Sequence, residues 1–169
     1  MSDPMTAAAL ARLQELEDRA EIADIVNRYG QGVRTRDVDL LCSLFTDDAV
    51  IDQGHGTVVQ GADAIRTHFG GPAANSTIGR SVLTFDEKIA STPVMSNTLV
   101  TLNGDTAHCE SMCLAIHTGI RDDQAVVMVR GTRNIDDLVR TPTGWKIRNR
   151  LHPAVWKFEL PGEAYGNGE

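Results

Sequence analysis

Three side chains of this 169-residue chain are suited to proton transfer: Tyr29, Asp52 and His117. A phenol, a carboxylate and an imidazole are groups that enzymes use as general acids and bases. In an apolar pocket, burial raises the pKa of a carboxyl group toward neutrality, and a nearby donor can stabilise an oxyanion that forms next to a carbonyl. If the fold brings them together, the three residues predict acid–base chemistry on a small molecule.

Each of the three also has a purely structural interpretation, which the sequence leaves open. Asp52 directly follows an apolar pair, and an Asp at the end of a strand often accepts hydrogen bonds from turn amides. Tyr29 lies on the apolar stripe of an expected helix and can equally be a core aromatic residue with a satisfied hydroxyl. His117 ends an expected strand, where a solvated imidazole is common.

Three further residues are candidates for substrate binding: Arg150, His152 and Asn97. Arg150 and His152 share one face of the last expected strand. They can reach the mouth of a pocket and hold a carboxylate or a phenolate, or they can lie on the surface, where Arg is usually found. Asn97 lies in an expected strand over 94–102.

Two adjacent carboxylates, Asp136 and Asp137, straddle the two faces of another expected strand. One of them therefore points inward in either register. Because a buried, unpaired carboxylate is costly, we expect the inward one to pair with Arg133 or Arg150.

Apolar residues at helical spacing predict the helices that must position these groups. The longest begins at a capping box at Asp18 and weakens at Gly30 and Gly32. A short helix follows a cap at Asp37, and a third covers 62–69.

Alternating and β-branched segments predict two groups of strands. Segments 49–52 and 57–60 form a first hairpin, after a turn at 46–48. Gly131 lies inside a later strand and indicates a bulge or a bend. Four long antiparallel strands are expected at 94–102, 106–118, 124–140 and 144–151. This order predicts an α+β fold with helices on one face of a bent sheet.

The strand at 106–118 has two contrasting faces. One face has small side chains, which suit the lining of a cavity, together with His117. The other face suits packing under helices. The first set is Cys109, Ser111, Cys113, Ala115 and His117, and the second is Glu110, Met112, Leu114 and Ile116.

The three cysteines, Cys42, Cys109 and Cys113, are interpreted as small core residues. Cys109 and Cys113 lie four apart in an extended strand, which is too far to pair easily. Cys and His residues show no zinc-site spacing, and there is no glycine-rich phosphate loop before a helix, so we expect neither a metal nor a cofactor.

Charge and hydropathy exclude other classes of partner. The net charge is −7 and the basic residues are scattered, which argues against nucleic acid as a partner. No apolar run is long enough to span a membrane, and the N-terminus lacks a signal-peptide pattern. We therefore expect a cytoplasmic protein of one domain.

The order of elements, with RYGQGVRTRDVDLLCSLFTDDAVID early and GTRNIDDLVRTPTGWKI late, resembles the SnoaL-like branch of the nuclear transport factor 2-like superfamily. The resemblance implies one domain over 1–169, with a core at about 16–152 and flexible ends. The implied fold is a cone-shaped α+β barrel, in which a strongly bent, mostly antiparallel sheet wraps on a long N-terminal helix. It also implies a cavity between sheet and helix, and frequently a homodimer.

The family includes polyketide cyclases, ketosteroid isomerases, scytalone dehydratase and binding domains without chemistry. Tyr29 matches a catalytic tyrosine of the bile-acid dehydratase type, and His117 falls within a residue of a catalytic histidine of the scytalone type. Arg34 and Gln53 stand where those dehydratases carry an acidic residue and a second tyrosine.

Together the residues and the resemblance predict a cofactor-independent lyase or isomerase that acts on a hydrophobic cyclic small molecule. Tyr29 and His117 would transfer protons, and Asp52 would act as base or orienter. The alternative is a non-catalytic binding or accessory protein with the same cavity, or a dimer whose cavity is filled by its own side chains.

Overall fold

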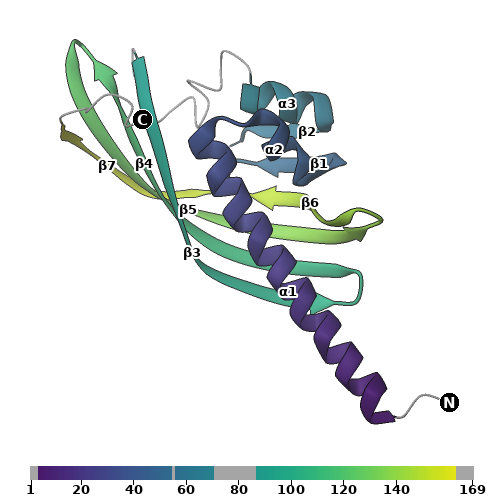
Figure 1. Cartoon of the computed structure of the whole chain (residues 1–169). Coiled ribbons are helices and arrows are strands. Elements are labelled where there is room, and N and C mark those ends of the chain that lie inside the picture. Colours follow the sequence, from purple (N-terminus) through teal and green to yellow (C-terminus); the bar gives the residue numbers. More distant parts are fainter. Residues whose placement is uncertain (1–3, 55, 71–86, 163–169) are drawn as a thin grey trace.

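A computed structural model describes residues 4–54, 56–70 and 87–162 of the chain. A long helix lies diagonally across the concave face of a bent sheet, and two short helices cover one end of it (Figure 1). The helices are α1 (Pro4–Thr35), α2 (Val38–Ser43) and α3 (Ala62–Gly70). The strands are β1 (Phe45–Asp52), β2 (Val58–Gln60), β3 (Glu87–Asn103), β4 (Thr106–Arg121), β5 (Gln124–Thr141), β6 (Gly144–Leu151) and β7 (Ala154–Pro161).

The sheet follows the order β2-β1-β6-β5-β4-β3. The pairing of β1 with β6 is parallel, and the other pairings among the described strands are antiparallel. One edge of β5 pairs with β7 along its first half and with β6 along its second half. The expected α+β fold is confirmed, with a bent, mostly antiparallel sheet that stays open within the described residues.

α1 is one continuous helix, so the expected start at an Asp18 capping box is wrong. Asp18 is buried within the helix, where its carboxylate accepts hydrogen bonds from Arg140 Nη1 at 2.8 Å and from Trp145 Nε1 at 3.1 Å. The Arg140 guanidinium holds the pKa of Asp18 well below its usual range. Asp18 therefore fastens the middle of α1 to the β5–β6 hairpin.

The glycines near the end of α1 permit close packing and do not end the helix. A Cβ on Gly30 would lie 2.8 Å from Met95 Cγ, and one on Gly32 would lie 2.8 Å from Leu41 Cγ. The core between α1, the short helices and the sheet includes Ile22, Ile25, Val26, Leu44, Ile51, Ile65, Leu138 and Ile147.

The strand predictions differ from the structure in three places. β3 begins at Glu87, well before the expected start at residue 94. The expected turn at 46–48 is part of β1, because this strand begins at Phe45, which pairs with Ile147 of β6. β7 was not expected, although Trp156, Phe158 and Leu160 alternate with polar residues. Its antiparallel partner is the first half of β5, a contact between segments that are distant in sequence.

The convex face of the sheet, turned away from α1, carries exposed apolar side chains. Cross-strand pairing puts Val94, Leu114 and Trp156 in one row with Gly131. A Cβ on Gly131 would lie 2.5 Å from Trp156 Cε2, so the glycine lets the indole lie flat on the sheet. Leu114 and its neighbour Met112 are exposed, so the expectation that this side of β4 packs under helices is wrong.

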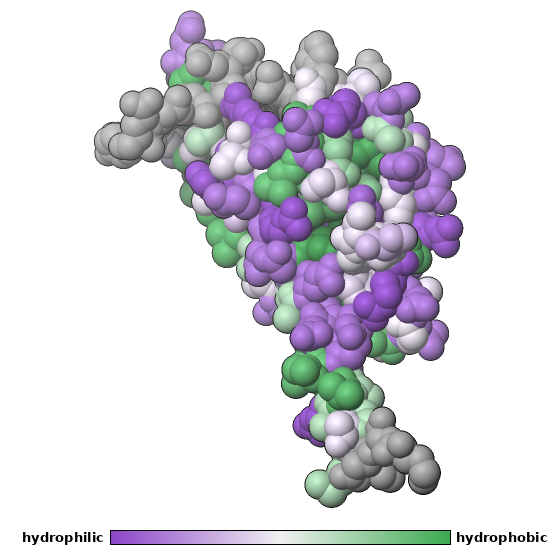
Figure 2. Space-filling view, turned by 45° about the vertical axis from the view of Figure 1, so that its right-hand side comes forward, coloured by the Kyte–Doolittle hydropathy of each residue, from purple (hydrophilic) through white to green (hydrophobic). Residues whose placement is uncertain are grey.

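The start of α1 extends beyond the sheet (Figure 1). Hydrophobic side chains gather on this projecting segment (Figure 2). The exposed ones are Met5, Leu10, Leu13 and Leu16. No helix among the described residues has the length and hydropathy needed to cross a membrane.

Candidate functional site

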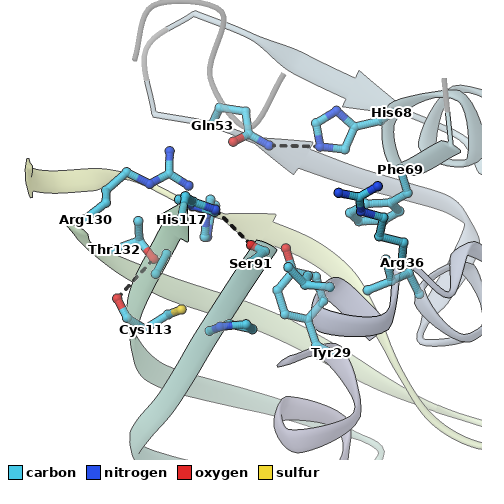
Figure 3. A pocket seen from close by; sticks show the side chains of 15 residues that line it. Tyr29, Arg36, Gln53, His68, Phe69, Ser91, Cys113, His117, Arg130 and Thr132 are labelled. Atoms are coloured by element: carbon cyan, nitrogen blue, oxygen red, sulfur yellow. Dashed lines mark hydrogen bonds between the residues drawn. The ribbon is translucent and has the colours of Figure 1, made fainter. Parts of the chain in front are cut away.

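A cavity of about 100 Å³ lies between the C-terminal half of α1, α3 and the concave face of the sheet. This volume is similar to that of cavities that hold one aromatic ring. Side chains from α1, α2, α3, β3, β4 and β5, and from Gln53 just after β1, converge on it (Figure 3). Its polar and charged lining residues are Tyr29, Arg36, Gln53, His68, Ser91, His117, Arg130, Thr132 and His152.

Strand register explains why these residues meet. Ser91 pairs with His117 across β3 and β4, and Arg130 of β5 pairs with Ala115 of β4. Paired residues point to the same face of a sheet, which here is the concave face. The small side chains of β4, such as Cys113 and Ala115, leave the space, as the alternation in that strand predicted.

His117 is buried, with 1% of its surface exposed, and does not form a solvated strand end. Its Nδ1 lies 2.8 Å from Ser91 Oγ. The hydroxyl of Tyr29 points toward Ser91 from α1 (Figure 3). Burial raises the pKa of the Tyr29 phenol, so this group stays protonated and can donate a hydrogen bond.

Arg150 packs against the ring of Tyr29. Its guanidinium lies 4.0 Å from the centre of the Tyr29 ring. It donates two hydrogen bonds to Asp136, at 2.7 and 2.8 Å. Of the two predicted partners, Arg150 is therefore the one that pairs with the inward carboxylate. The interpretation of Arg150 as a surface residue is wrong, and it does not line the cavity.

His152 lies in the break between β6 and β7, where it reaches the cavity. It too is buried and not a surface residue. Its Nδ1 lies 2.6 Å from Asn134 Oδ1, and Asn134 Nδ2 donates to Ser111 Oγ. The amide oxygen accepts from Nδ1–H and leaves the lone pair on Nε2. Burial lowers the pKa of His152 to about 3, so the ring is neutral at physiological pH.

Two lining residues come from the β1 end and α3. Gln53 is buried, and its Nε2 lies 3.4 Å from His68 Nε2. Burial lowers the pKa of His68. Neither Gln53 nor His68 was predicted as a site residue. Gln53 was noted only because it stands where the dehydratases carry a tyrosine.

The structure does not bring Asp52 or Asn97 into the cavity lining. Asp52 Oδ1 accepts a hydrogen bond from the Gly54 amide at 2.8 Å, which is its structural interpretation. Asn97 is exposed, has a positive φ of 53° and donates to Met112 Sδ. It therefore faces the convex side of the sheet.

The described lining contains two arginines and three histidines but no Asp or Glu. Among these described lining residues, the imidazoles are the side chains best suited to act as a base near neutral pH. Among the residues that the structure describes, no three His, Cys, Asp or Glu side chains gather as metal ligands.

Residues 14–151 match the SnoaL-like domain family. A curated relative, an uncharacterized protein of Mycobacterium tuberculosis, is 28% identical over 144 residues, which cover 85% of this chain and 89% of that protein. A solved structure from Novosphingobium aromaticivorans, provisionally named an aromatic ring hydroxylase, is 27% identical with a TM-score of 0.66, covering 87% and 94% of the two chains.

A second solved structure has the same fold at lower identity. It is a hexachlorocyclohexane dehydrochlorinase of Novosphingobium barchaimii, with 15% identity and a TM-score of 0.72. The match covers 93% of this chain and 99% of that one.

Proposed function

The chain belongs to the SnoaL-like domain family, and from this premise we propose that it is a cofactor-independent lyase or isomerase acting on a hydrophobic cyclic small molecule. The observation that carries the proposal is the buried imidazole of His117, held by Ser91 at 2.8 Å in a cavity that Tyr29 also enters. A relative of the same fold is named for the elimination of hydrogen chloride, so this fold accommodates elimination chemistry.

In the proposed reaction, His117 removes a proton from a carbon next to a carbonyl group of the substrate. Ser91 accepts a hydrogen bond from Nδ1–H, which leaves the lone pair on Nε2 to take the proton. Tyr29 donates a hydrogen bond to the carbonyl oxygen as negative charge develops there. In an elimination, the bond from the β-carbon to its hydroxyl group then breaks and the oxygen takes the proton from His117, so that water leaves. In an isomerisation, His117 returns the proton to another carbon.

His117 thus takes the role of base, for which the sequence also offered Asp52 as an alternative to its role as orienter. Asp52 is engaged with the turn amide of Gly54. Arg150 contributes as a positioning residue, because its guanidinium lies against the ring of Tyr29 while both of its bonds to Asp136 hold it in place.

Variants of the two proton-transfer residues test this function. We expect His117→Ala and Tyr29→Phe each to lower kcat/KM about 10²–10⁴-fold, the usual contribution of a general acid or base. The substrates are a panel of cyclic β-hydroxy ketones and β,γ-unsaturated cyclic ketones, whose conjugated products are followed by ultraviolet absorbance. His108→Ala is the matched control, because His108 is an exposed histidine of the same strand that pairs with Asp137 outside the cavity.

The competing function is binding without turnover, which the absence of Asp and Glu from the described lining favours. Turnover that is unchanged in His117→Ala and Tyr29→Phe would contradict the proposed catalysis. Tight binding of panel members by the wild-type protein with no product would establish the binding function in its place.

We also propose that two copies of the chain associate through the convex face of the sheet. This face exposes Leu114, Trp156 and Phe158, and the Trp156 and Phe158 rings stack with centroids 5.9 Å apart. Large exposed apolar patches on a sheet mark interaction surfaces. A second copy presents the same patch, so a two-fold contact would bury both.

Charged substitutions on this face test the dimer. We expect wild-type protein to elute as a dimer, and Leu114→Glu with Phe158→Glu to elute as a monomer, in size-exclusion chromatography with light scattering. Each substitution would bury a carboxylate at the centre of the contact. Val58→Glu, at an exposed position of β2, is expected to remain dimeric. A monomeric wild-type protein would refute the dimer.

A further inference from the structure

One imidazole of the cavity, that of His152, has its tautomer set by a residue of the sheet. Asn134 is fully buried, and its Oδ1 lies 2.6 Å from Nδ1 of His152. The ring is neutral near pH 7, because burial lowers the pKa of His152 to about 3. An amide oxygen can only accept a hydrogen bond, so the proton of the neutral ring is on Nδ1. Nε2 of His152 therefore carries a lone pair and is a hydrogen-bond acceptor.

Contacts on both sides hold this pair of side chains in place. Asn134 of β5 pairs with Ser111 of β4, and its Nδ2 donates a hydrogen bond to Ser111 Oγ at 3.4 Å. The main-chain amide of His152 donates to the carbonyl oxygen of Asp52 at 2.7 Å. Because Asn134 and Ser111 are both buried, the acceptor for Nδ1–H keeps its orientation. The ring of His152 thus lines the cavity with its tautomer already fixed.

The acceptor on His152 complements the donor on Tyr29. The Tyr29 phenol lines the same cavity and stays protonated, because burial raises its pKa. A buried acceptor favours a ligand group that can donate to it over one of the same size that cannot, since the second takes the place of water without replacing its hydrogen bond. The cavity of about 100 Å³ has room for about one ring. A single ring that bears a carbonyl group and a hydroxyl group can therefore accept from Tyr29 and donate to His152.

We propose that His152 recognises a hydroxyl group on the cyclic ligand of this cavity, and that Asn134 is the positioning residue that keeps Nε2 as the acceptor. The proposal rests on the function proposed above and narrows its substrates to hydroxylated rings, such as the cyclic β-hydroxy ketones. A hydroxyl group that donates to His152 keeps its own lone pairs available, so it can still take the proton from His117 when it leaves as water.

Phenol and fluorobenzene form the test pair, because fluorine is close in size to a hydroxyl group but cannot donate a hydrogen bond. We expect wild-type protein to bind phenol about tenfold more tightly than fluorobenzene in isothermal titration calorimetry, the effect of one well-formed hydrogen bond. In His152→Phe, which keeps a ring but removes the acceptor, this preference is expected to disappear. His108→Phe is the matched control, because His108 is exposed and pairs with Asp137 outside the cavity, so the preference is expected to be unchanged.

Nitrogen NMR of the histidine rings tests the role of Asn134 without any ligand. We expect the ring of His152 in wild-type protein at pH 7 to be neutral and to carry its proton on Nδ1. Asn134→Leu removes the acceptor for this proton, so the proton is expected to move to Nε2 in part of the molecules, and the phenol preference is expected to fall with it. A merely structural role of Asn134 would lower the melting temperature and leave the tautomer and the preference unchanged.

Four results would each overturn the proposal: equal or weaker binding of phenol than of fluorobenzene by the wild-type protein, no binding of either at millimolar concentration, a preference that survives in folded His152→Phe, or a wild-type ring that carries its proton on Nε2. Thermal melting identifies a variant that does not fold, and His152→Leu then takes the place of His152→Phe. Neither calorimetry nor NMR requires turnover. A phenol preference with no catalysis would therefore contradict only the proposed reaction, and catalysis without the preference would contradict only the role of His152.

Discussion

Replacing Asp136 with Asn is expected to lower the free energy of unfolding by about 3–5 kcal/mol, as when one partner of a buried ion pair is removed. Arg150 and Asp136 are each 1% exposed and share two hydrogen bonds. The amide of the variant cannot neutralise the guanidinium, which stays buried among apolar groups. Urea denaturation at neutral pH measures the change.

Asp137→Asn is the matched control, because the adjacent carboxylate is 62% exposed and pairs with His108. Its expected effect is below about 1 kcal/mol. The double replacement Asp136→Leu with Arg150→Met removes both charges and is expected to recover much of the loss. A loss below about 1 kcal/mol for Asp136→Asn would show that the pair is not as tightly buried as its geometry indicates.

Acidification from pH 7.5 to pH 5 is expected to cost about 2 kcal/mol of stability through His152 alone. Burial lowers the pKa of His152 in the folded chain to about 3, whereas the ordinary pKa of a histidine is 6.5. Below pH 6.5, His152 therefore binds a proton in the unfolded chain, whereas in the folded chain it stays neutral until the pH approaches 3. This contribution to stability is complete above pH 6.5 and is lost as the pH falls toward 3.

His68, whose pKa is also lowered by burial, acts in the same direction. Chemical denaturation at several pH values between 5 and 8 measures the slope, above the range in which most carboxylates titrate. His152→Gln is expected to flatten it. His108→Gln is the opposite control, since nearby Asp137 raises the pKa of His108, and its stabilising effect is present at low pH and lost as the pH rises. Identical slopes in wild type and His152→Gln would contradict the assignment.

The fold could be predicted because local patterns in the chain agree with it. Period-2 alternation placed His117 and the small residues of β4 on one face, and that face lines the cavity. The helix that carries Tyr29 was recognised from its apolar stripe, which packs in the core. Each of these inferences needed only residues close together in sequence.

The rest of the site depended on register between distant strands. Ser91 and Arg130 enter the cavity because each pairs with a particular residue of β4, and a shift of one residue would turn both outward. The sequence left open whether His152 reaches the pocket or lies on the surface, because nothing local shows that β6 gives way to β7 at that point. The alternation of Trp156 and Phe158 was a usable signal for β7.

Asp18 illustrates the same limit. Its sequence context fits a helix cap, and local reasoning cannot see Arg140, which lies 122 residues away and binds its carboxylate. A buried polar residue in a helix interior has to be explained by such a distant partner, because its own neighbours in the helix cannot satisfy it.

The parallel pairing of β1 with β6 has a consequence for the order of assembly during synthesis. β1 leaves the ribosome early and can form only its short hairpin with β2. The other edge of β1 stays unpaired until residues 144–151 have been synthesised, almost a hundred positions later in the chain. Closing so long a segment is slow relative to local pairing. The nascent chain therefore holds β1 without its parallel partner until nearly the whole domain has been translated, and this stage is the one in which chaperone binding would matter most.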